Sequence, residues 1–133
     1  MLNKHFIIIG LAFTLLLAGS KDIFSTYNFE EALSVGKTEG KGVLVKFHAD
    51  WCHFCKKMDR ETFTDQYVQK AMEDYISVKV NVDSKEGMAL ARKFGVAGLP
   101  TIIMFDKNGK RVYYKPGFHS AKQLKEVLSG KNG

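Results

Sequence analysis

The sequence predicts a mixed α/β domain in which helices flank a central sheet. Three apolar runs rich in β-branched and aromatic residues have the length of strands, at Val43–Phe47, Tyr75–Val82 and Thr101–Phe105. Segments with helical periodicity separate these runs, and a hairpin signal follows the last of them. Strands that alternate with helices and end in a hairpin and a closing helix are typical of this fold class.

Helix signals precede the first strand. Asn28 followed by Glu31 is a capping-box pattern and predicts a helix that ends near Gly36–Gly40. The run Val43–Phe47 is interrupted only by Lys46, as expected for a strand that is covered on both faces.

Two helices are expected between the first and second strands. One follows the first strand directly and carries Cys55 and Met58. Thr64 or Asp65 caps the other, which is short. Its apolar face consists of Val68, Ala71 and Met72.

The second half repeats the alternation. After the strand Tyr75–Val82, Ser84 caps a helix that ends at Gly95. Asn108-Gly109 predicts a tight turn, so Arg111–Lys115 should pair antiparallel with the preceding strand. The last helix has a capping box and a glycine stop, at Ser120, Gln123 and Gly130.

The first 20 residues have the pattern of a secretory signal peptide. Lys4 and His5 precede the apolar stretch Phe6–Ala18, which is short for a membrane span, and small residues follow. We expect cleavage after Ser20 and a mature domain over residues 21–133. The pattern predicts a periplasmic or otherwise extracytoplasmic location, with a membrane anchor if the segment is not cleaved.

The charge pattern gives no sign of a nucleic-acid partner. The chain has 20 Lys and Arg against 14 Asp and Glu, a net charge of +6. These basic residues are scattered, which is typical of a solvated surface rather than of a nucleic-acid stripe. We expect a monomer that binds no nucleic acid.

Both cysteines of the chain lie in the segment W-C-H-F-C at Trp51–Cys55. The segment follows a buried strand and opens a helix, whose N-terminus favours a thiolate. Cysteines at this spacing can close a disulfide that converts reversibly to a dithiol. Because so short a loop constrains the unfolded chain little, a stabilising role explains the pair poorly and a redox role explains it well.

The same cysteine spacing is half of many zinc sites. A structural zinc site needs four ligands, usually completed by a second C-x-x-C or by two regularly spaced histidines. His48, His53 and His119 do not have such a spacing. Metal binding is therefore the minor alternative, and we expect neither a metal nor a cofactor.

Three segments resemble the thioredoxin superfamily in order and spacing. They are V-L-V-K-F-H-A-D-W-C-H-F-C-K-K-M at Val43–Met58, V-N-V-D at Val80–Asp83 and F-G-V-A-G-L-P-T-I-I-M-F at Phe94–Phe105. The resemblance covers Asn28–Leu128 and implies a thioredoxin-like fold. With T-F-T-D at Thr62–Asp65, the chain is most similar to the periplasmic C-terminal domain of DsbD-type thiol reductases.

The resemblance implies roles for individual residues. Cys52 would attack a substrate disulfide, and Cys55 would resolve the mixed disulfide. Pro100 matches the family's cis-proline, which leaves the backbone before it free to pair with an extended substrate, although a strand-entry proline is the simpler alternative. Leu99 would line the substrate groove. The surface around the thiols would come from Trp51, His53 and Phe54, although the two aromatics could instead be packing residues.

Lys46 departs from the family pattern. Thioredoxin-like strands often carry a carboxylate at this position, where it accepts a proton from the second thiol. A buried ammonium is unfavourable unless its pKa falls, it finds a partner or it reaches solvent. Asp59 and Asp50 are the expected partners. Asp59 falls where DsbD-like domains have a second acidic residue, and it is the candidate for a proton relay to Cys55.

These observations predict an extracytoplasmic thiol:disulfide oxidoreductase that reduces protein disulfides and is itself reduced by a membrane electron donor of DsbD type. One alternative is a thioredoxin-like reductase of cytochrome c maturation, although such proteins typically carry an insert that this chain lacks. The other is a redox-inert binding module of the same fold, against which the intact cysteine pair argues.

Overall fold

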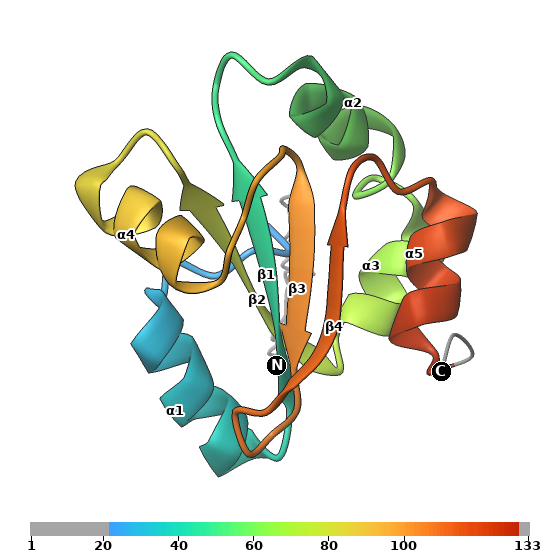
Figure 1. The fold of residues 1–133 in the computed structure, drawn as a ribbon. Coiled ribbons are helices and arrows are strands. Elements are labelled where there is room, and N and C mark those ends of the chain that lie inside the picture. The colour runs from blue at the N-terminus through green and yellow to red at the C-terminus, as the bar shows by residue number, and fades with distance from the viewer. Residues whose placement is uncertain (1–21, 131–133) are drawn as a thin grey trace, which may run out of the picture.

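The computed structural model of the protein describes residues 22–130, so the expected signal peptide at residues 1–20 lies outside the described residues. Helices flank a central sheet whose strand order is β2-β1-β3-β4 (Figure 1). The strands are β1 (Gly42–His48), β2 (Tyr75–Asn81), β3 (Thr101–Phe105) and β4 (Arg111–Pro116). The helices are α1 (Phe29–Glu39), α2 (His53–Glu61), α3 (Gln66–Met72), α4 (Lys85–Lys93) and α5 (Ala121–Leu128). The predicted fold class is confirmed.

The sheet is mixed because its central strand has one neighbour of each kind. β1 runs parallel to β2 and antiparallel to β3, and β4 pairs antiparallel with β3. The predicted hairpin between β3 and β4 is present: the amide of Gly109 donates to the carbonyl of Asp106 over 2.9 Å, and Gly109 has a φ of 81°. β2 and β4 form the two edges of the sheet.

The helix caps follow the sequence signals closely. The capping boxes of α1 and α5 are both formed, and Ser84 caps α4. Of the two candidates for α3, Asp65 is the cap, whereas the Thr64 hydroxyl donates to the carbonyl of Arg60. α1 runs through Gly36 and ends at Glu39, and its C-cap is Gly40, whose φ of 69° suits glycine.

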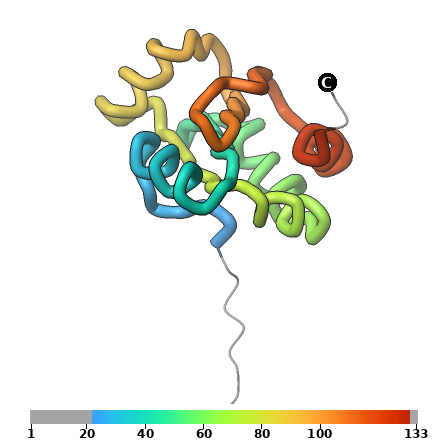
Figure 2. Tube along the Cα trace, turned by 90° about the horizontal axis from the view of Figure 1, so that it is seen from below, coloured from blue at the N-terminus to red at the C-terminus, as the bar shows by residue number. Residues whose placement is uncertain are grey.

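Each face of the sheet has its own apolar cluster. Figures 1 and 2 show α1 and α4 on one side of the sheet and α3 and α5 on the other. The α1 and α4 side includes Val43, Val45, Phe47, Ile103 and Phe105 from the strands. The opposite cluster includes Leu44, Met58, Ile102, Met104 and Leu124. Strand alternation therefore turns Lys46, which lies two residues after Leu44 on β1, toward the second side.

A buried histidine joins the end of α2 to the turn before α5. The Nδ1 atom of His119 lies 3.0 Å from the carbonyl oxygen of Gly117, and its Nε2 atom lies 2.9 Å from the hydroxyl of Tyr113. Because a carbonyl only accepts, Nδ1 carries the proton and Tyr113 donates to Nε2. The Thr62 hydroxyl donates to the carbonyl of His119 over 2.6 Å. Burial lowers the pKa of His119, so the neutral ring is favoured.

This arrangement predicts a pH-dependent stability. The unfolded chain takes up a proton on His119 near the ordinary value of about 6.5, but the folded ring resists it. The free energy of unfolding should therefore be highest above that value and fall as the pH drops below it. Urea unfolding at about pH 7.5 and about pH 5 measures the effect in the wild type and in His119→Gln.

His119→Gln should be less stable than the wild type at the higher pH, by about 1–3 kcal/mol, because it disturbs buried hydrogen bonds. It should also lose less stability on acidification, since its side chain does not titrate. The carboxylates contribute equally to both proteins and cancel in the comparison. Identical losses in the two proteins would show that His119 does not carry the pH dependence.

Candidate active site

The two cysteines form a disulfide at the start of α2. Cys52 and Cys55 are joined, with their Cα atoms 5.2 Å apart. Cys52 is the N-cap of the helix, and its sulfur accepts a hydrogen bond from the amide of Cys55 over 3.1 Å. The free amides and dipole of a helix N-terminus stabilise a sulfur anion in the reduced state. Local structure thus favours thiolate character at Cys52.

The two cysteines are similarly buried but have different surroundings. Cys52 is 5% exposed and Cys55 is 2% exposed, so both are buried. Cys52 is flanked by exposed residues, with Trp51 70% and Phe54 53% accessible to solvent. The Trp51 indole donates to the carboxylate of Asp83 over 3.0 Å, which fixes the ring beside the disulfide. The sequence does not predict this role of Asp83, because nothing along the chain links it to Trp51.

The loop before β3 also reaches the disulfide. Leu99 is half-buried and packs against the cluster of Ala49, Cys52 and Cys55. The Leu99–Pro100 peptide bond is cis, which is the geometry that the family resemblance implies, and Pro100 is buried. Within residues 22–130, the amide groups of Ala97, Gly98 and Leu99 donate no hydrogen bond. The segment that carries these unpaired donors therefore reaches the reactive pair through Leu99.

Lys46 is fully buried beneath Cys55. Its ammonium donates to the Asp59 carboxylate over 2.6 Å and to the carbonyl of Cys55 over 3.3 Å. It also lies 5.1 Å from the centre of the Phe63 ring. Of the arrangements expected from the sequence, the structure contains the pair with Asp59, and Lys46 does not reach solvent. Burial lowers the pKa of Lys46, and the bond to Asp59 opposes this effect.

A second lysine, Lys79, also contacts Asp59, and the sequence does not predict this contact. Its ammonium lies 3.3 Å from the same Asp59 oxygen that Lys46 contacts. The two lysines are direct partners in the register of β1 and β2, so one carboxylate serves two cations. Sequence alternation predicts which residues of a strand share a face, but it does not give the register between two strands. We call Lys46, Asp59 and Lys79 the charge cluster.

The charge cluster affects its neighbourhood and has access to solvent. Burial and the two lysines lower the pKa of His48 on the same strand as Lys46. A pocket of about 410 Å³ reaches Asp59 and Lys79 beside Phe63 and Gln69. The Asp59 side chain is 39% exposed, whereas that of Lys46 is 0% exposed. Asp59 thus connects the buried ammonium of Lys46 to a solvent-accessible pocket.

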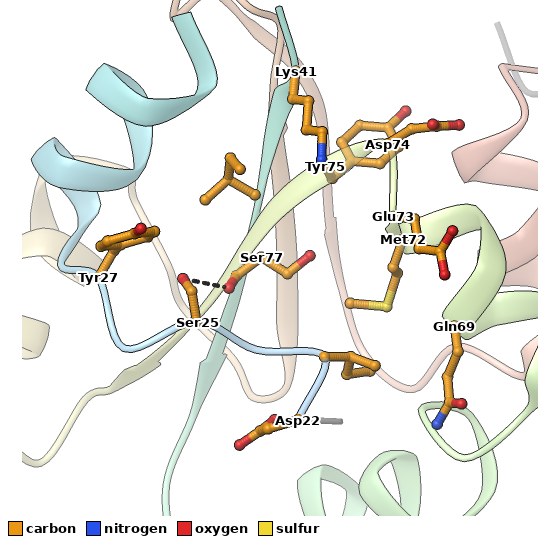
Figure 3. A pocket seen from close by; sticks show the side chains of 12 residues that line it. Asp22, Ser25, Tyr27, Lys41, Gln69, Met72, Glu73, Asp74, Tyr75 and Ser77 are labelled. Carbon is orange, nitrogen blue, oxygen red and sulfur yellow. Dashed lines mark hydrogen bonds between the residues drawn. The ribbon is translucent and has the colours of Figure 1, made fainter. Parts of the chain in front are cut away.

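A pocket of about 730 Å³ lies along the outer edge of β2 (Figure 3). Neither cysteine lines it, nor does any other predicted site residue. There the amide and hydroxyl of Ser25 donate to the carbonyl of Ser77.

Among residues 22–130, no group of three or more His, Cys, Asp or Glu side chains is placed to hold a metal ion, and no helix is both long and apolar enough to cross a membrane.

Comparison with characterised proteins identifies relatives for this region. The thiol:disulfide interchange protein DsbD of Actinobacillus pleuropneumoniae is 38% identical over 96 residues, which are 69% of this chain and 16% of that protein. The DsbD protein of Escherichia coli K12 is 40% identical over 76 residues, which are 56% of this chain and 14% of that protein. The chain therefore spans only a small part of the relatives that it matches.

Solved structures have the same fold. A thioredoxin from Thermus thermophilus is 29% identical with a TM-score of 0.71, over 79% of this chain and 84% of that chain. The reduced C-terminal domain of DsbD from Neisseria meningitidis is 28% identical with a TM-score of 0.63, over 76% of this chain and 91% of that chain. A family model for the thioredoxin-like domain matches residues 29–130. The chain belongs to the thioredoxin-like family, with a domain similar to the C-terminal domain of DsbD.

Proposed function

We propose that this protein is a thiol:disulfide oxidoreductase that reduces disulfides in other proteins outside the cytoplasm. The main support is the disulfide at the N-cap of α2, beside exposed aromatic side chains and the unpaired amides of residues 97–99. An extended peptide can bind such amides while its disulfide approaches the cysteines. Relatives named thiol:disulfide interchange proteins lend further support.

The reaction begins with the reduced protein. The Cys52 thiolate attacks one sulfur of the substrate disulfide, which forms a mixed disulfide and releases the first substrate thiolate. The Cys55 thiolate then attacks the Cys52 sulfur, which closes the Cys52–Cys55 disulfide and releases the second substrate thiolate. Two electrons pass to the substrate. The two protons of the original dithiol pass to solvent or nearby side chains, and the two released thiolates take up two protons to become thiols.

The positions of the cysteines support this assignment of roles. The Cys52 sulfur accepts a hydrogen bond from an amide at the N-terminus of α2, and the nearby residues Trp51 and Phe54 are exposed. Cys55 lies in the first turn of α2, against the fully buried Lys46. We assign Cys52 as the attacking thiol and Cys55 as the resolving thiol, with Leu99 and Pro100 forming the side of the substrate groove.

The charge cluster serves the resolving thiol in this proposal. The Lys46 ammonium favours a thiolate at Cys55, because a nearby cation lowers a thiol's pKa. Asp59 holds the ammonium in place and leads to the pocket at Lys79. We assign Asp59 as the relay through which the Cys55 proton exchanges with solvent.

The location and the electron donor complete the proposal. The signal-peptide pattern of residues 1–20 supports export. Outside the cytoplasm a reductase needs a supply of electrons, because the surroundings oxidise its dithiol. A membrane donor of DsbD type fits this need and would reduce the Cys52–Cys55 disulfide by the same two exchange steps, in the opposite direction. We expect the protein to act as a monomer.

The assigned roles predict opposite behaviour of the two cysteine variants. Cys52→Ser should abolish the reduction of insulin, because no thiol is left to begin the attack. Cys55→Ser should retain the first attack and accumulate mixed disulfides, which mass spectrometry of the unreduced protein detects. Alkylation of the reduced wild type should label Cys52 first. Preferential labelling of Cys55, or insulin reduction by Cys52→Ser, would overturn the assignment.

The role of Lys46 predicts a change in redox equilibrium. Lys46→Met keeps most of the volume and removes the cation, so the pKa of at least one thiol should rise and the protein should become more reducing. The equilibrium with glutathione should shift about three- to tenfold toward the disulfide. Titration of thiolate absorbance gives the thiol pKa independently.

Lys79→Met is the matched control, since it removes a cation from the same carboxylate but from a position that is 36% exposed. Its shift should be smaller, because solvent screens partly exposed charges. If Lys46→Met matches the wild type in both measurements, the buried cation does not tune the thiols, and Asp59 alone is left as the proton route.

A further inference from the structure

Apart from the bonds at the end of α4, in which the amides of Gly95 and Val96 donate to the carbonyls of Arg92 and Ala91, three hydrogen bonds hold the loop that carries the unpaired amides. It runs from Phe94, at the end of α4, to Pro100. At the carboxyl end of the loop, the Thr101 hydroxyl donates to the carbonyl of Gly98 over 2.7 Å. The amide of Gly117 donates to the carbonyl of Pro100, also over 2.7 Å. At its amino end, the Tyr114 hydroxyl donates to the carbonyl of Gly95 over 2.9 Å.

Of the three residues that donate these bonds, Tyr114 is the most distant along the chain from the residue that accepts. It lies on β4, 19 residues beyond Gly95, and pairs across the sheet with Ile103. Ile103 belongs to the cluster on the α1 and α4 side, and the loop residues Val96 and Leu99 pack against that cluster. The Tyr114 side chain thus spans from the edge strand to the loop, on the side of the sheet where the loop packs.

Core packing does not account for Tyr114. The residue is 36% exposed and belongs to neither of the clusters that pack on the two faces of the sheet. The Arg111 guanidinium lies 5.6 Å from the centre of its ring, on the same exposed strand. Its hydroxyl is therefore the group that ties it to another element. Gly95, which accepts this bond, has a φ of 67° and begins the turn out of α4.

The unpaired amides lie between the points at which the loop is held. Ala97 and Gly98 are exposed, and Leu99 packs against the cysteine cluster. A segment that presents backbone donors to a partner binds more tightly when its conformation is fixed beforehand, since less conformational entropy is lost on binding. Small disulfides need only reach Cys52 and gain nothing from these donors.

We propose that Tyr114 is a positioning residue for protein substrates, which fixes the loop so that residues 97–99 can pair with an extended segment next to the substrate disulfide. The proposal rests on the function proposed above, and it adds a determinant of substrate class. Tyr114 acts through the loop and touches neither thiol. Its loss should weaken the recognition of protein disulfides and leave the chemistry of the cysteine pair unchanged.

The test uses Tyr114→Phe, which removes only the hydroxyl. With dithiothreitol as the constant reductant, KM for insulin should rise about three- to tenfold, the range expected for one lost hydrogen bond, while kcat changes little. The rate with hydroxyethyl disulfide and the glutathione equilibrium should equal those of the wild type. Thr101→Val, which removes the hydroxyl at the other end of the loop, should change KM in the same direction.

Tyr113→Phe is the matched control. It removes the neighbouring hydroxyl, which bonds to His119 on the opposite side of the sheet. This variant should lose stability without a selective rise in KM for insulin. A rise in Tyr113→Phe equal to that in Tyr114→Phe, or losses toward insulin and hydroxyethyl disulfide alike in Tyr114→Phe, would reduce the effect to general stability and overturn the proposal.

A second measurement separates this proposal from the proposed function. The heteronuclear NOE of the amides of Ala97, Gly98 and Leu99 should fall in Tyr114→Phe and stay at the wild-type value in Tyr113→Phe. Unchanged NOE values would overturn the positioning role whatever the kinetics show. A wild-type protein that does not reduce insulin would refute the proposed function, and a fall in the NOE would still support the positioning role.

Discussion

The burial of the central part of β1 determines where the reactive groups lie. Residues Val43–Phe47 are covered on both faces, and β1 pairs with a strand on each side, so neither its position nor its register can shift without breaking both pairings. The chain leaves this strand at His48, and α2 begins at His53, which places Cys52 at the helix cap. The same strand carries Lys46 beneath α2. The disulfide and the buried cation therefore have a fixed geometry, since both are attached to this buried strand.

A buried cation at this position needs compensation, and the structure provides only part of it. Removing an ammonium from water is strongly unfavourable unless a counter-charge and hydrogen bonds replace the solvent. Asp59 supplies the counter-charge for Lys46 but shares it with Lys79, so the charge cluster carries an excess positive charge when all three groups are ionised. A thiolate at Cys55 would neutralise that excess. The cluster is thus complementary to the reduced, ionised cysteine pair rather than to the disulfide, which has no charge.

Local sequence signals, such as helix caps and turns, predicted most of the fold. They did not predict contacts between segments that are far apart along the chain. The capping box at Asn28 and the hairpin at Gly109 depend on a few adjacent residues, and both are present. The cysteine pair and its helix were predicted for the same reason. The contact of Lys79 with Asp59 depends on the register between two strands, and the bond from Tyr114 to Gly95 depends on how an edge strand lies beside a loop. Neither relationship is encoded in spacing along the chain.

The surroundings of the disulfide fall into two groups of contacts that act on different steps. The charge cluster lies beneath Cys55 and affects the protonation of the thiols, but its ammonium groups do not contact the loop before β3. That loop is held by Tyr114 and Thr101 through backbone carbonyls, and these bonds involve no ionised group. Because the two groups share no hydrogen bond, substitutions in them should combine additively. Redox equilibrium and recognition of protein substrates can then vary independently on one scaffold, the first through charges under α2 and the second through the anchoring of one loop.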